Sequence, residues 1–283
     1  MGGARMKKRS TIKKLIAHAI LIIFSVIILF PVYWMLVSSI QTNESIFSTT
    51  LHLLPLQWDW KNFIRAWQAQ PFAIFLVNSI ASNGLIVLAQ VITSSLSAYA
   101  LVFLPFRGKK TLFFLILMAM MVPIQTTFIP IYLILSKVQL INTYAALVLP
   151  FVGSAFGIFL LRQGFISIPV EMINAARIDG ANEWRILRLV VLPNVKPSII
   201  TLVLLNFVYH YNNLFWPLVA TNTTNMRVIP VALSYFLNQE PGQTLQWNLM
   251  MAADLFSVIP VILIFLFGQR YIVKGVANTS VKG

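Results

Sequence analysis

Long apolar stretches separated by polar segments cover most of the 283-residue chain. A helix needs about 20 mainly apolar residues to cross the hydrocarbon of a bilayer, and it satisfies its backbone hydrogen bonds within itself. These stretches are too long for the strands of a soluble core. The pattern therefore predicts an all-α integral membrane protein with six transmembrane helices, at about residues 15–39, 73–104, 111–129, 143–161, 198–220 and 249–267.

The polar segments between these stretches are predicted to lie outside the bilayer. Residues 1–14 form a basic tail, residues 40–72 form a loop rich in tryptophan, and residues 271–283 form a polar, basic tail. Within the second apolar stretch, the small residues of 94–100 predict close packing against a neighbouring helix. The remaining predicted loops comprise residues 106–110, 132–142 and 221–248.

Residues 169–197 are the only long stretch that carries charge and also has a helical pattern. Pro169 suits the first position of a helix. Gly180 is expected to end that helix, because glycine readily adopts the left-handed backbone of a helix C-terminus. A second short helix is predicted over residues 182–191 and is ended by Leu192 and Pro193. We call this helix-turn-helix segment, residues 169–197, the elbow.

Composition and charge agree with a membrane protein and fix its orientation. The chain is 58% hydrophobic and only 10% charged, which excludes an ordinary soluble domain. Of its 21 lysines and arginines, 17 fall at residues 1–14, 106–110, 162–196 and 268–283, and four fall in the other loops. The positive-inside rule places both termini and the elbow in the cytoplasm. This topology, rather than nucleic-acid binding, explains the net charge of +14.

The sequence carries no pattern typical of a catalytic, nucleotide or metal site. The segment from Gly108 to Thr111 lacks the upstream glycine that a phosphate-binding loop requires, so the chain is not expected to bind ATP. Cysteine is absent, which excludes thiol chemistry. The three histidines are scattered along the chain and do not indicate zinc. We therefore expect a protein that is not an enzyme and binds no metal or cofactor of its own.

Polar residues within the apolar stretches are the candidates for a solute pathway. The fifth stretch mixes amides with aromatic residues, a combination that binds sugars, because amides bond hydroxyl groups and rings cover apolar C–H faces. An alternative role for these amides is helix geometry. An acid inside the sixth stretch is costly and suggests either a pathway role or a structural role near the interface. The candidate pathway residues are Asn78, Asn206, Tyr209, Asn212, Asn213 and Asp254.

The elbow resembles the coupling loop of permease subunits in binding-protein-dependent ABC importers, especially the sugar-uptake branch. The residues that carry the resemblance are Ala175, Ala176, Asp179, Gly180, Ala181, Leu192 and Pro193. The resemblance covers about residues 70–283 and implies a type I importer permease fold, with a core at 73–270 and a coupling loop at 165–197. It implies docking of residues 169–193 on the ATP-hydrolysing partner. The family usually has glutamate where this chain has Asn174, which puts any ion pair from that position in doubt.

The resemblance also implies the assembly in which the chain works. The expected partners are a second homologous permease subunit, two ATP-binding subunits that hold ATP and Mg, an extracytoplasmic sugar-binding protein and the lipid membrane, with no nucleic acid. The expected location is a bacterial or archaeal cell membrane. The implied coupling residues are Glu171, Asn174, Ala175, Ala176, Asp179, Gly180, Ala181, Trp184, Arg188 and Pro193.

Two other functions remain open from the sequence. The first is an ion-gradient-driven secondary transporter. Such proteins carry intramembrane ion sites or inverted repeats, whereas this sequence has Asp254 as its single acid within the apolar stretches and no visible repeat. A membrane-embedded enzyme is the second, although no cluster of catalytic groups at one depth is apparent. The identity of the transported solute is also open, and the candidates are oligosaccharides, disaccharides and a polyol phosphate.

Overall fold

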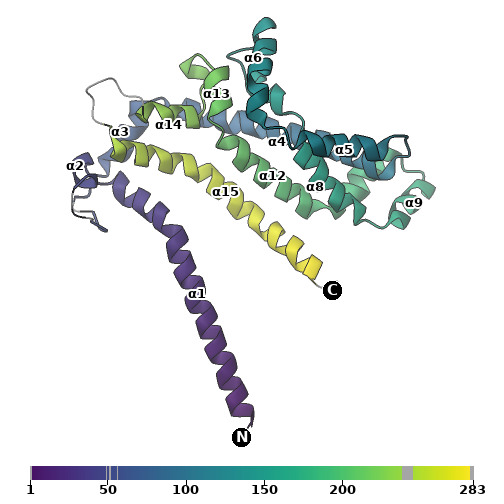
Figure 1. Ribbon diagram of the computed structural model, residues 1–283, viewed down its shortest axis with the longest axis horizontal. Helices are drawn as coiled ribbons and strands as arrows, with labels where there is room; N and C mark the ends of the chain where they lie inside the picture. The colour runs from purple at the N-terminus through teal and green to yellow at the C-terminus, as the bar shows by residue number, and fades with distance from the viewer. Residues whose placement is uncertain (1, 49, 51, 56, 238–244, 281–283) are drawn as a thin grey trace. The chain divides into compact units, whose positions relative to one another are not determined.

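The computed structural model describes residues 2–48, 50, 52–55, 57–237 and 245–280 (Figure 1), and every regular element in these residues is helical. The chain divides into two compact units. The first comprises the residues up to 70 together with 235–256, and the second comprises residues 71–234 and those from 257 onward. The longer helices of the chain are α1 (Gly2–Ser39), α4 (Phe72–Phe103), α8 (Ala155–Ile166), α12 (Lys196–Tyr211) and α15 (Trp247–Ser280).

Three of the predicted transmembrane helices are single continuous helices. The segments Lys14–Ser39 of α1, Phe72–Phe103 of α4 and Trp247–Arg270 of α15 are each long and apolar enough to cross a membrane. In length and composition these segments agree with the first, second and sixth predicted spans. The helix α1 also continues back to Gly2, through the predicted basic tail.

The third and fourth predicted spans are each a bent pair of helices rather than one continuous helix. In the third, α5 (Lys109–Ala119) meets the segment formed by η1 (Ile124–Thr127) and α6 (Phe128–Lys137) at 92°. Proline has no backbone N–H to continue a helix, and Pro123 stands at this break with extended backbone (ψ 124°). In the fourth, the segment Tyr144–Phe151 meets α8 at 49°, and the hydroxyl of Ser154 caps the new helix.

The boundaries of other predicted segments also need correction. The fifth predicted span divides into α12 and α13 (Phe215–Ala220). The predicted loop at 132–142 is largely the second half of α6, and the loop at 221–248 contains η4 (Thr224–Met226) and α14 (Ile229–Leu237). The predicted C-terminal tail is helical as far as Ser280. Residues 238–244 of the long loop and 281–283 of the tail lie outside the described residues.

The second unit is built around α4, with α8 and α12 packed along it (Figure 1). The helices α4 and α8 approach closely at Gly157, where an added Cβ would overlap the Ser94 hydroxyl and stand 3.2 Å from Leu202. This contact confirms the close packing predicted from the small residues of 94–100. Buried Ala98, Leu161 and Leu202 belong to the same apolar core.

The first unit brings the tryptophan-rich loop against the beginning of α15. The buried amide of Asn62, on α3 (Lys61–Ala69), donates hydrogen bonds to the carbonyls of Ser39 (3.1 Å) and Gln41 (2.9 Å). The ring of Phe256 packs edge-on against Phe63 and Trp67. The short helix α2 (Asn43–Ile46) begins at Asn43, whose side chain accepts a bond from the backbone N–H of Trp247 at 3.0 Å. These contacts tie the loop to the ends of two long helices.

Candidate functional site

The elbow folds as two short helices joined by a tight turn, as predicted. The helix α9 (Val170–Ile178) ends at a turn in which Gly180 has φ +79°, the left-handed backbone expected for it. The backbone N–H of Ala181 bonds the carbonyl of Ala176 at 3.0 Å across this turn. The next helix, α10 (Glu183–Ile186), is capped by Asn182, whose side chain accepts a bond from the N–H of Arg185 at 2.8 Å.

Two details of the elbow differ from the prediction. Pro169 is the N-cap of α9 rather than its first helical residue. The second helix does not end at Leu192 and Pro193, because α10 passes into a π-helical segment, η3 (Leu187–Val191), and then into α11 (Leu192–Asn194). Pro193 is the second residue of α11, which follows η3 without a break. The turn follows at Val195, before α12.

The elbow has a buried anchoring face and an exposed face. Ile173, Ile186 and Val191 are fully buried in the core cluster that also holds α4 and α8 residues. Five large apolar side chains of the elbow are exposed, and the most open are Ile178 at 87%, Leu189 at 63% and Trp184 at 61%; the other two are Val170 and Met172. Among the other predicted coupling residues, Ala176 and Ala181 are half-buried, and the exposed ones are Glu171, Asn174, Ala175, Asp179, Gly180, Arg188 and Pro193. An exposed apolar face on a firmly anchored segment is typical of a protein-docking surface.

A cluster of three polar side chains joins the elbow to α4. The guanidinium of Arg177 donates to both carboxylate oxygens of Glu183, at 3.0 and 3.2 Å, and the hydroxyl of Tyr99 on α4 donates to the same carboxylate. The bonds from Arg177, then that from Tyr99, hold the pKa of the Glu183 carboxyl below its usual range. Because Arg177 and Glu183 are both partly exposed, the ion pair contributes only about 0.2–1 kcal/mol to stability. The role of this ion pair is therefore to hold the side chains in a fixed geometry rather than to stabilise the fold.

A second candidate site is an open pocket of about 580 Å³ between α4, α12 and the broken third and fourth spans. This volume falls in the range of small-molecule sites. Tyr209 and Asn206, both predicted pathway residues, line the pocket, and Tyr209 is 57% exposed. Several further lining residues are polar or aromatic: Gln90, Gln125, Phe151, Ser154, Phe156 and His210.

The side chain of Gln90 contacts three other residues that line this pocket. Its side-chain oxygen accepts a bond from the amide of Asn206 at 2.6 Å, and its nitrogen donates to the carbonyl of Phe151 at 2.8 Å. The same nitrogen lies 3.0 Å from Nε2 of His210. Gln90 was not among the predicted pathway residues, although a glutamine in the middle of an apolar helix is the kind of residue that marks a polar site in a membrane.

We expect the substitution Gln90→Leu to lower the stability of the protein by about 1–2 kcal/mol, because hydrogen bonds inside a membrane protein are worth about 0.6 kcal/mol each. The change removes the partner of Asn206, Phe151 and His210 at once. Thermal unfolding of the purified protein in detergent measures the effect. Gln163→Leu, at an exposed position of α8, is the matched control. An unchanged midpoint for Gln90→Leu would show that these bonds carry no net stability.

The remaining predicted pathway residues occupy other places. Asn78 makes three hydrogen bonds to distant parts of the chain. Its side-chain nitrogen donates to the carbonyls of Asn225 (2.7 Å) and Arg227 (2.9 Å), and its side-chain oxygen accepts a bond from the hydroxyl of Tyr144. Asn212 is exposed at the end of α12. Asp254 belongs to the first unit, whereas the pocket belongs to the second.

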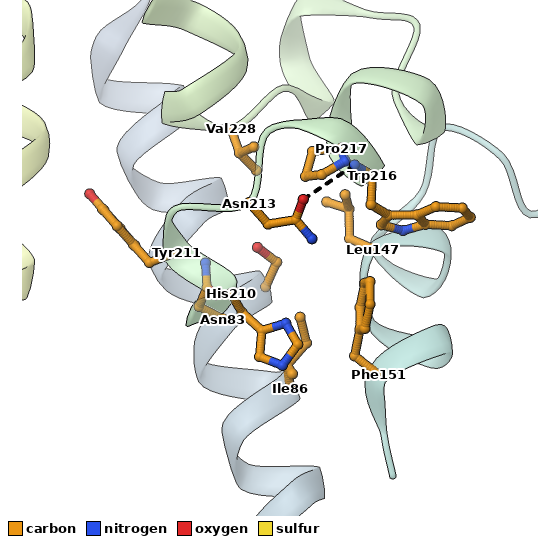
Figure 2. A pocket seen from close by; sticks show the side chains of 11 residues that line it. Asn83, Ile86, Leu147, Phe151, His210, Tyr211, Asn213, Trp216, Pro217 and Val228 are labelled. Carbon is orange, nitrogen blue, oxygen red and sulfur yellow. Dashed lines mark hydrogen bonds between the residues drawn. The ribbon is translucent and has the colours of Figure 1, made fainter. Parts of the chain in front are cut away.

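Asn213 lines a much smaller cavity of about 20 Å³, close to the volume of one water molecule (Figure 2). Its side-chain oxygen accepts a bond from the backbone N–H of Trp216 at 3.3 Å, as the dashed line in Figure 2 marks. His210 and Phe151 line both the small cavity and the larger pocket, with their rings 4.9 Å apart. These two rings therefore form the partition between the two spaces.

Comparison with known proteins agrees with the resemblance seen in the elbow. The sequence profile of the family described as "Binding-protein-dependent transport system inner membrane component" matches residues 90–278. The sn-glycerol-3-phosphate transport system permease protein UgpE of Yersinia pestis bv. Antiqua (strain Antiqua) is 32% identical over 269 residues, which cover 93% of this chain and 95% of the relative. UgpE of Brucella abortus (strain 2308) is 33% identical over 282 residues, covering 97% and 100%.

Solved structures share the fold. A chain in the crystal structure of a bacterial ABC transporter involved in the import of the acidic polysaccharide alginate has a TM-score of 0.80 and 26% identity, covering 93% of this chain and 97% of that one. A second crystal structure, of the bacterial alginate ABC transporter in complex with an alginate pentasaccharide-bound periplasmic protein, matches at a TM-score of 0.64 and 16% identity, covering 93% and 94%, and supports the fold alone.

Proposed function

The chain belongs to the family of binding-protein-dependent transport system inner membrane components, and we propose that it is the transmembrane subunit of an ATP-driven carbohydrate importer. In this role it forms half of the translocation pathway and is coupled through residues 169–193 to a separate ATPase dimer. As a member of this permease family it is a translocation subunit and a multi-pass membrane protein. The relatives, whose names describe ABC or transport-system permeases, favour this function over an ion-gradient-driven transporter.

The exposed face of the elbow is the observation that carries the proposal. Ile178 and Trp184 are large apolar side chains left open to solvent on a segment whose opposite face is fully buried. In a lone chain this exposure is unfavourable, and it is relieved when a partner covers the face. The distribution of basic residues supports a cytoplasmic position for the elbow and both termini, on the side where ATP is available.

The proposed assembly supplies the groups that this chain lacks. Two ATP-binding subunits hold ATP and Mg, a second homologous permease completes the pathway, and an extracytoplasmic binding protein delivers the sugar. The proposed location of the complex is a bacterial or archaeal cell membrane. Hydrolysis on the partner changes the relative stability of two states of the permease, and transport requires that the sugar bind one state better than the other.

The pocket of about 580 Å³ is the proposed contact of this chain with the sugar. The amides of Gln90, Gln125 and Asn206 supply hydrogen-bond donors and acceptors for hydroxyl groups. The ring of Tyr209 supplies a flat apolar surface and a hydroxyl. The bond between Gln90 and Asn206 fixes the orientation of two amides before a solute arrives, which lowers the entropic cost of binding.

Co-purification and uptake test the proposal together. The affinity-tagged chain is expressed with its neighbouring genes, purified in mild detergent and reconstituted in liposomes with the cognate binding protein, whose sugar is found by ligand screening. We expect a second permease and an ATPase to co-purify, and the sugar to enter only when ATP is on the ATPase side. Purification of the chain alone from a strain that takes up the sugar, or uptake driven by an ion gradient without ATP, would contradict the proposal.

We expect Tyr209→Ala to weaken sugar uptake about tenfold at low sugar concentration, because losing one stacking and hydrogen-bonding side chain costs about 1.4 kcal/mol of binding. Concentration dependence of uptake in the reconstituted system measures the change. Tyr209→Phe separates the ring from the hydroxyl. Ile92→Ala, at an exposed position of α4 outside the pocket lining, is the control. Equal uptake by Tyr209→Ala and the control would show that this pocket is not part of the sugar pathway.

A further inference from the structure

We infer that the cluster of Tyr99, Glu183 and Arg177 transmits movement of the elbow to α4, which makes Glu183 a positioning residue for transport. The inference rests on the proposed function, since it assumes that the elbow is moved by a partner. It adds the connection inside this chain between the docking face and the pocket. Neither the sequence nor the resemblance of the elbow indicated this connection.

One carboxylate holds three helices together at this point. Arg177 lies in α9, Glu183 in α10 and Tyr99 in α4, and all of the bonds described above converge on Glu183. Arg177 also donates to the carbonyl of Phe103, at the end of α4, at 3.4 Å. The ring of Tyr99 also packs against Phe103, with the two ring centroids 5.3 Å apart. The elbow is therefore bonded to α4 at two points.

The bonded residues are next in sequence to the exposed apolar ones. Arg177 precedes Ile178, and Glu183 precedes Trp184. A partner that displaces Ile178 and Trp184 therefore displaces the two charged side chains directly. The buried contacts of Ile173 and Ile186 also link the elbow to the core, but apolar contacts are less directional than hydrogen bonds. Hydrogen bonds to a charged group impose a defined direction, so the cluster fixes how α4 follows the elbow.

The helix α4 connects this cluster to the pocket. It is continuous from Phe72 to Phe103, and Gln90 lies nine residues before Tyr99. At a rise of 1.5 Å per residue, the two positions are about 14 Å apart along the axis. Since Gln90 bonds Asn206 and Phe151 and lies beside His210, a shift of α4 alters the pocket wall and the partition. Coupling through a packed helix with defined contacts at both ends is a physical route between sites.

A labelling experiment tests this route without a transported ligand. The chain contains no cysteine, so Tyr209→Cys provides one reactive thiol in the pocket. The complete complex with its ATPase subunits is reconstituted, and a membrane-impermeant maleimide is applied from one side, with and without ATP and vanadate. The ratio of the two labelling rates reports how far ATP changes access to the pocket. ATP hydrolysis and the amount of co-purified ATPase are measured on the same samples.

Tyr99→Phe and Glu183→Gln, each added to this background, are the test variants. We expect each to reduce the ATP-dependent labelling ratio about five- to tenfold, the lower part of the usual range of coupling between sites, while ATP hydrolysis and co-purification stay at parental levels. Tyr33→Phe, which removes a tyrosine hydroxyl bonded to the Leu53 carbonyl in the first unit, is the matched control and should leave the ratio unchanged. A merely structural role would instead lower the yield and the co-purified ATPase.

Two different failures are distinguishable in this design. If the parental complex lacks an ATPase, or shows no ATP-dependent change in labelling, the proposed function fails. If the parental complex responds and Tyr99→Phe and Glu183→Gln respond equally well, the role of the cluster is overturned while the proposed function stands.

Discussion

Gly180→Val is expected to abolish ATP-dependent uptake while the protein still inserts into the membrane. Gly180 has φ +79°, a backbone that a β-branched residue adopts only at a cost of about 1–3 kcal/mol. A Cβ added at this position would meet no neighbouring atom within 4 Å, so the cost arises from the backbone and not from a clash. Relief of this strain reorients α9 relative to α10 and moves the docking face. Uptake and membrane content of the variant are measured together.

Gly180→Asn and Gly84→Ala complete this experiment. Asparagine tolerates the left-handed backbone, so Gly180→Asn should retain most of the uptake. Gly84 lies within α4 with open space around its Cβ position, and Gly84→Ala should transport normally. Full uptake by Gly180→Val would show that the conformation of this turn is unimportant for coupling.

Ile178→Asp is expected to weaken binding of the ATPase subunit about a hundredfold, with little effect on the stability of the permease. Ile178 is 87% exposed, so a charge there costs the free chain almost nothing. In the assembly, the same substitution removes a buried apolar side chain and leaves an unpaired charge, at a combined cost of about 3 kcal/mol. The ratio of co-purified ATPase to permease measures the effect.

Val138→Asp is the matched control for this prediction. Val138 is also an exposed aliphatic residue, and it follows α6 rather than the elbow. In the proposed topology it lies on the opposite side of the membrane, so its substitution should leave the ATPase bound. Equal loss of ATPase from both variants would point to general damage, and retention by Ile178→Asp would exclude Ile178 from the interface.

The sequence was sufficient to predict the helical class, the apolar stretches and the turn of the elbow. Hydropathy and length identify a membrane-spanning segment, and Gly180 has a backbone preference strong enough to place the turn. The same arguments could not predict the 92° and 49° bends, since hydropathy reports the length of an apolar stretch and not its direction. Pro123 lies at the first of these bends, but a proline in a membrane helix is compatible with a mild kink as well as with a break.

The candidate sites were predictable only where the signal was local. Asn206 and Tyr209 share a helix, and the structure places both at the pocket. Gln90 and Tyr99 act through partners far away in the chain, Asn206 and Glu183, and a single sequence carries no record of such contacts. Asn78 is a similar case, because its amide bonds the carbonyls of Asn225 and Arg227, also far away in the chain. The identity of the sugar depends on contacts that no motif in this chain encodes.

Site-specific cross-linking from the elbow is the most direct test of the proposed coupling. Ile178→Cys introduces one thiol into a chain that has none, at the most exposed large apolar side chain of the elbow. A short bifunctional reagent is applied to membranes that contain the functional complex, and the adducts of this chain are identified by mass spectrometry. We expect an adduct with the ATP-hydrolysing subunit, and no labelling by an impermeant maleimide added to intact cells. Labelling from outside the cell, or no adduct in a complex that hydrolyses ATP and transports sugar, would contradict the role of the elbow.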